Sequence, residues 1–122
     1  MNRITILGTG HATVTRCYNT CFALQTDTTT LLVDAGGGNG ILQRLEQAGI
    51  AIKDLHHMYV THAHTDHILG TIWVIRMVLS AAGYEGQFHV YSHAKVLRVI
   101  GMICGETLSV KHRRLMGERV VM

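Results

Sequence analysis

Proline is absent from this 122-residue sequence, and charged residues are scarce. Without proline, no turn can depend on a side chain that fixes the φ angle. Charged residues make up 16% of the chain and hydrophobic residues 48%, whereas charged residues average about 25% of a soluble domain. We therefore expect either an unusually complete core or an apolar surface that another chain covers.

Cysteine is also rare, and its pattern excludes two classes of small protein. Cys17, Cys21 and Cys104 form no C-x-x-C pair, so neither a disulfide framework nor a zinc ribbon is predicted. Free thiols indicate a reducing compartment, and we expect a cytoplasmic protein. The longest apolar stretch, residues 68–79, is interrupted and too short for a membrane span, so no membrane partner is expected.

Basic residues give the chain a net charge of +3, and a basic run occupies residues 111–114. Such a run can contact phosphate or RNA. No aromatic residue interleaves with it, so a solvated loop or tail is the alternative interpretation.

The length suits one domain, with strands first and then alternating helices and strands. Residues 27–29 form a connection short enough to force an antiparallel hairpin. The order predicts an α/β (α+β) fold with a mixed sheet and helices on one or both faces. The hydrophobic patterns predict strands at 3–7, 21–25, 30–33, 57–61, 88–92 and 119–121, and helices at 41–48, 71–82 and 94–104.

The segment Thr61–Gly70, read as a loop after an apolar strand, concentrates metal-binding side chains. His62 and His64 are two residues apart, so on leaving a strand they project to one side and can form half of a tetrahedral zinc site. Asp66 and His67 follow one turn later and can serve a second ion. Two ions about 3.5–4 Å apart can activate a bridging hydroxide. The sequence therefore predicts a binuclear site for two Zn²⁺, with Mn²⁺ or Fe²⁺ as alternatives.

The segment Thr61–Gly70 resembles the H-x-H-x-D-H signature of the metallo-β-lactamase superfamily. Three further segments are similar in order and spacing to the N-terminal half of that fold: Leu7–Gly10, Leu31–Gly36 and Phe88–Ser92. The ribonuclease Z-like metallohydrolases are the most similar branch. The resemblance implies that residues 1–122 are a single, truncated domain, the N-terminal half of an αββα sandwich.

The resemblance also implies roles for individual residues. His62 and His64 would bind the first zinc, and Asp66 and His67 the second. Asp66 would also be the catalytic proton acceptor. Asp34 would lie beneath the loop and orient a ligand histidine, although a simple turn residue is an alternative interpretation of Asp34.

The chain departs from the family after this signature. The family adds a third histidine for the first metal, a bridging aspartate and a last histidine, whereas this chain has no aspartate after Asp66. His93 could approach the site or cap a helix, and His11 could contact substrate. The glycine-rich run 36–40 could cradle a phosphate or serve as a flexible turn.

Two functions follow from these observations. The first is a metal-dependent hydrolase that cuts a phosphodiester, such as RNA or a nucleotide, or a related ester. The alternative is a catalytically incomplete metal-binding half-domain. In either case a homo-oligomer or a complementary chain would cover the exposed sheet.

Overall fold

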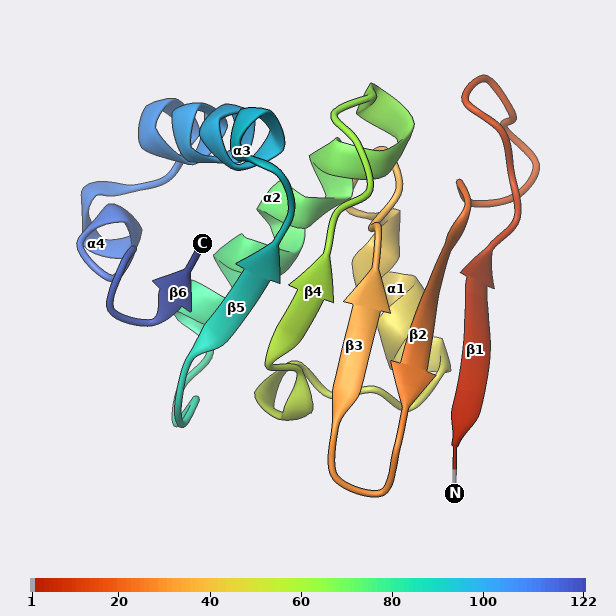
Figure 1. The fold of residues 1–122 in the computed structure, drawn as a ribbon, viewed down its shortest axis with the longest axis horizontal. Coiled ribbons are helices and arrows are strands. Elements are labelled where there is room, and N and C mark those ends of the chain that lie inside the picture. The colour runs from red at the N-terminus through yellow and green to blue at the C-terminus, as the bar shows by residue number, and fades with distance from the viewer. Residues whose placement is uncertain (1) are drawn as a thin grey trace.

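The computed structural model describes residues 2–122 and contains one six-stranded sheet in the order β1-β2-β3-β4-β5-β6 (Figure 1). Strands therefore lie side by side in the order in which they occur along the chain. Their bounds are Arg3–Gly8 (β1), Cys21–Gln25 (β2), Thr30–Val33 (β3), His57–Tyr59 (β4), Phe88–Tyr91 (β5) and Val120–Val121 (β6).

The sheet is mixed, as the sequence predicted. The strands β1, β2 and β3 pair antiparallel, and β3, β4, β5 and β6 pair parallel. The first pairs are joined without a helix, whereas each parallel pair is separated by at least one helix, which provides the length that a crossover needs. The carboxyl ends of β3, β4 and β5 therefore lie along one edge.

The helices are α1 (Gly40–Gln47), α2 (Thr65–Ser80), α3 (Ala94–Thr107) and α4 (Val110–Arg113), and a short 3₁₀ helix, η1, spans Ile52–Asp54. The predictions for α1 and α3 are correct to within a few residues at each end. The short α4 was not predicted.

The prediction for the second helix is wrong at its start. It was placed at 71–82, but α2 begins at Thr65 and ends at Ser80. His64 has an extended backbone and precedes the first turn, and its carbonyl accepts hydrogen bonds from the main-chain N–H groups of His67 and Ile68 at 3.0 Å. Asp66 and His67 therefore lie in the first turn of a helix and not in a loop.

One face of the sheet is covered by α1 and α2, which lie behind the strands in Figure 1. Strand side chains that alternate toward this face are buried, including Leu32, Met58 and Val90. They pack with buried residues of α1 and α2 in one continuous core. This packing holds the first turn of α2 against the end of β3.

The opposite face of the sheet carries apolar side chains that are exposed. Ile4 and Ile6 of β1, Leu24 of β2, Tyr59 of β4 and Tyr91 of β5 are among the exposed large hydrophobic residues. The pairing register places them in adjacent rows of one face. Among the described residues, no helix is long and apolar enough to cross a membrane.

Candidate metal centre

Asp34 follows the last residue of β3 and has a backbone conformation that is unusual for a residue with a side chain. Its φ is +59°, and only 5% of the residue is exposed. The left-handed conformation costs an ordinary L-residue roughly 1–2 kcal/mol, although aspartate tolerates it better than most. The main-chain N–H of Asp34 donates to the Tyr59 carbonyl at 2.9 Å, which holds the turn against the end of β4.

The Asp34 carboxylate accepts three hydrogen bonds from the histidine motif. Oδ1 accepts from the main-chain N–H of Thr61 at 2.8 Å, and Oδ2 accepts from the Thr61 hydroxyl at 2.7 Å. Oδ2 also lies 2.8 Å from Nδ1 of His67. Asp34 therefore lies against both ends of the motif, which is more than a turn residue requires.

The three histidines of the motif lie together. The rings of His62 and His64 have centroids 4.6 Å apart and meet edge to face, and those of His62 and His67 are 4.1 Å apart. His62 thus lies in contact with both other rings. The motif leaves β4, turns at residues 61–64 and enters α2, so one continuous segment brings all three imidazoles to the carboxyl edge of the sheet.

Asp66 and His67 approach each other in the first turn of α2. Oδ2 of Asp66 lies 3.2 Å from Nε2 of His67. Two donor atoms bound to one zinc ion at bonds of about 2.0–2.1 Å and a tetrahedral angle are about 3.3–3.4 Å apart. The pair therefore fits a shared cation, although a protonated imidazole would satisfy the same contact.

The side chains of the motif do not by themselves complete a metal site. Among residues 2–122, no group of three or more His, Cys, Asp or Glu side chains is placed to hold a metal ion. The residue types and the Asp66–His67 spacing fit zinc, but catalytic zinc sites use about three protein ligands per ion. Side-chain rotation or additional donors would be needed to complete either site.

The other histidine candidates lie outside this cluster. His93 is exposed and precedes α3 as its N-cap residue, without a side-chain capping bond. His11 is exposed, and its Nδ1 lies 3.5 Å from the Thr13 hydroxyl. The structure gives neither side chain a contact with the motif among the described residues.

The side chain of Tyr18, which had no predicted role, packs against the glycine-rich run that follows Asp34. The Tyr18 hydroxyl donates to the carbonyl of Ala35 at 2.5 Å or to that of Gly38 at 2.8 Å. A Cβ at Gly36 or Gly40 would lie within 3 Å of the Tyr18 ring. These glycines therefore admit the Tyr18 ring, and burial raises the pKa of its hydroxyl to about 12.

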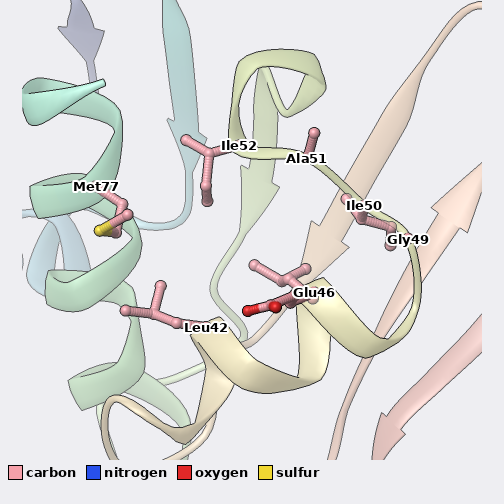
Figure 2. Close-up of a pocket in the computed structure, with 8 residues that line it drawn as sticks. Leu42, Glu46, Gly49, Ile50, Ala51, Ile52 and Met77 are labelled. Carbon is pink, nitrogen blue, oxygen red and sulfur yellow. The ribbon is translucent and has the colours of Figure 1, made fainter. Parts of the chain in front are cut away.

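Two further surface features, the basic run and an apolar groove, include none of the metal-binding side chains of the motif. In the basic run, Lys111, Arg113 and Arg114 are exposed at and just after α4. Figure 2 shows an apolar groove between α1, residues 49–52 and α2, lined by Leu42, Ile52 and Met77 with Glu46 at its side. None of the residues that line this groove belongs to the segment Thr61–Gly70.

A family model described as Anti-Pycsar protein Apyc1 matches residues 2–101. The chain belongs to this family. Ribonuclease Z of Streptomyces avermitilis is 35% identical over 79 residues, which are 64% of this chain and 26% of that protein. Metallo-beta-lactamase domain-containing protein 1 of Xenopus laevis is 31% identical over 71 residues, which are 56% of this chain and 23% of that protein.

Solved structures show the same fold. The short form of human tRNase Z superposes with a TM-score of 0.71 at 20% identity, covering 86% of this chain and 39% of that one. A diphosphatase from the PhnP family superposes with a TM-score of 0.65 at 20% identity, covering 86% and 48%. The predicted metallo-β-lactamase resemblance and the mixed α/β fold are confirmed. The chain spans about a quarter of the length of the curated relatives it matches.

Proposed function

We propose that this chain contributes the first half of the active site of a metal-dependent hydrolase that cuts a phosphodiester or a related ester. The observation that carries the proposal is the cluster of His62, His64 and His67 with Asp66, supported from below by Asp34. The relatives named ribonuclease Z favour a phosphodiester in RNA as the substrate, with a nucleotide as the alternative.

The roles of the residues follow from their positions. His62 and His64 would hold one ion, and Asp66 with His67 a second, with zinc as the first candidate and Mn²⁺ or Fe²⁺ as alternatives. When bound, such ions lower the pKa of a water molecule and polarise the ester. Asp66 would accept the proton released during hydrolysis, and Asp34 would hold His67 with Nε2 directed toward the ion.

We propose that the missing donors and the cover for the exposed sheet face come from a second layer, supplied by another copy of the chain or by a complementary chain. The exposed apolar rows of the sheet that include Ile4 and Ile6 support this arrangement, because a contiguous apolar sheet face is normally packed against another layer. The three cysteines are free, which suits the cytoplasmic location that we also propose.

Hydrolysis of bis-p-nitrophenyl phosphate in the presence of Zn²⁺ or Mn²⁺ tests the enzymatic function. We expect turnover by the chain and a loss of about 10²-fold or more in His64→Ala, which removes a proposed ligand. His93→Ala is the matched control, since His93 is exposed and lies outside the cluster. Equal rates in the chain and in His64→Ala would contradict the proposal.

Metal content per chain and mass in solution distinguish the enzyme from a catalytically incomplete metal-binding module. Two ions per chain in an assembly larger than a monomer would support completion of the site by a partner. Stable metal binding without turnover in such an assembly would favour the incomplete module.

A further inference from the structure

We propose that Thr61 is a positioning residue that determines which ring nitrogen of His62 is free to bind a metal. The inference rests on the proposed function, because it concerns a histidine assigned there as a ligand. It extends that function to a side chain that is not itself a proposed metal ligand.

The Thr61 hydroxyl lies between two partners. Its Oγ1 is 2.7 Å from Oδ2 of Asp34 and 2.8 Å from Nδ1 of His62. Both distances are typical of good hydrogen bonds. The main-chain N–H of Thr61 separately donates to Oδ1 of Asp34 at 2.8 Å. This main-chain hydrogen bond positions Thr61 beside Asp34 independently of the hydroxyl.

The hydroxyl has one proton, and this determines the direction of both bonds. An ionised carboxylate can only accept, so the Thr61 proton goes to Asp34. The remaining lone pairs of Oγ1 can only accept, so Nδ1 of His62 must carry the proton that it shares with Oγ1. Nε2 of His62 then bears the lone pair that a metal requires.

The same carboxylate acts directly on His67. Oδ2 of Asp34 lies 2.8 Å from Nδ1 of His67, which leaves Nε2 of His67 facing Asp66. Asp34 therefore orients one histidine by direct contact and the other through the Thr61 hydroxyl. A hydrogen bond that fixes the tautomer of a ligand histidine typically changes metal affinity by about 10–100-fold.

His64 provides an internal comparison. Among the described residues, the structure gives the His64 side chain no hydrogen bond, whereas both His62 and His67 have one at Nδ1. We therefore expect one dominant neutral tautomer for His62 and no such restriction for His64 in the metal-free chain.

Two substitutions separate the hydroxyl from the rest of Thr61. Thr61→Val keeps the shape and the main-chain bond to Asp34 but removes the hydroxyl. Thr61→Ser keeps the hydroxyl and removes only a methyl group. Thr61 is exposed, so neither change opens a cavity in the core, and the amide spectrum of each variant checks that it is folded.

The experiment is ¹⁵N–¹H correlation of the histidine rings in the metal-free chain at about pH 8. We expect His62 to carry its proton on Nδ1 in the parent and in Thr61→Ser, and to lose this preference in Thr61→Val. His64 should be unchanged in all three. A proton on Nε2 of His62 in the parent, or an unaltered His62 in Thr61→Val, would overturn the proposal.

Zinc affinity, measured by competition with a chromophoric chelator, gives the second readout. We expect Thr61→Val to bind zinc about 10–100-fold more weakly and Thr61→Ser to bind like the parent. Equal affinity in all three proteins would also overturn the proposal. Because the tautomer is measured without metal or substrate, failure of hydrolysis in the parent would overturn the proposed function and leave this inference standing.

Discussion

Gly70 of α2 lies so close to Ala35 that a Cβ on Gly70 would be 1.9 Å from the Ala35 carbonyl oxygen. The main-chain N–H of Gly70 also donates to the Gly36 carbonyl at 2.8 Å. The second turn of α2 is thereby attached to the segment that follows β3. This attachment places His67, one turn earlier, beside Asp34.

Gly70→Ala should therefore destabilise the chain. The clash is with backbone atoms that cannot rotate away, and overpacking of this kind costs about 1–3 kcal/mol or more. The change should appear as a lower midpoint in urea denaturation. Gly105→Ala is the control, because Gly105 lies in α3 and, among the described residues beyond its own helical turn, no atom lies within 4 Å of an added Cβ. Alanine should stabilise the helix there by about 0.5–1 kcal/mol. Equal midpoints for the two variants would contradict the close approach of Gly70 to Ala35.

Asp34→Asn should weaken zinc binding by about 10–100-fold while preserving the fold. Asparagine tolerates the left-handed backbone of this position. It replaces the charged carboxylate that accepts a hydrogen bond from the Thr61 hydroxyl and faces His67 with a neutral amide. Chelator competition measures the affinity. Asp54→Asn is the control, since Asp54 lies in η1, outside the site. An unchanged zinc affinity in Asp34→Asn would show that Asp34 is only a turn residue.

Tyr18→Phe should lower the free energy of unfolding by about 1–3 kcal/mol. The substitution removes the hydroxyl that donates a hydrogen bond to the carbonyl of Ala35 or of Gly38, so neither carbonyl has this donor in the variant. Thermal unfolding of the two proteins measures the difference. Tyr91→Phe, on an exposed residue of β5, should change the stability less. The reverse order would contradict the role of Tyr18 in supporting the glycine-rich run.

Alkaline pH should destabilise the chain through the same residue. Burial raises the pKa of Tyr18 to about 12, above its ordinary value of 10.0, so the folded state retains its proton after the unfolded state has lost it. The contribution of Tyr18 is therefore complete below pH 10 and is lost as the pH rises toward about 12. Urea midpoints across this range should fall less steeply in Tyr18→Phe. Parallel profiles for the parent and the variant would count against this assignment.

Acidic pH should destabilise the folded chain through protonation of His57. Burial, followed by the neighbouring His89 and His56, lowers the pKa of His57 below 6.5, and the Tyr91 hydroxyl lies 3.1 Å from its Nδ1. The neutral form is favoured in the fold, so this contribution is present above pH 6.5 and is lost as the pH falls through the lowered value. His57→Gln should flatten the stability profile in this range, whereas His93→Gln should not. An equally steep acid profile in His57→Gln would contradict the prediction.

The exposed sheet face yields a prediction about assembly. Ile6→Asp should reduce the mass in solution to that of a monomer, because a charge would be buried under the covering layer without a partner. Ile6 is 60% exposed, so the monomer should remain folded. Met102→Asp is matched in exposure at 63% but lies on α3, and should leave the mass unchanged. Sedimentation velocity measures both, and loss of assembly in Met102→Asp alone would place the interface elsewhere.

Local sequence was sufficient for the strands and for the location of the candidate site. The bounds of β2 and β3 are those predicted, because two apolar runs flank a short polar turn that forces a hairpin. The segment Thr61–Gly70 was recognised from its residue types alone. Its assignment as a metal site, and the ligand roles within it, remain predictions.

Tertiary structure decided what the local pattern could not. The second helix was predicted to begin at residue 71, yet α2 runs through Gly70 from Thr65. The close approach of Gly70 to Ala35 requires a residue without a side chain at this position of the helix. Tyr18 and Asp34 act on segments more than fifteen residues away, so no periodicity signals their partners. The sequence by itself determined which side chains could form the site. The pairing of β3 with β4 decided that Asp34 meets Thr61 and His67, because parallel strands bring their carboxyl ends to the same edge of the sheet.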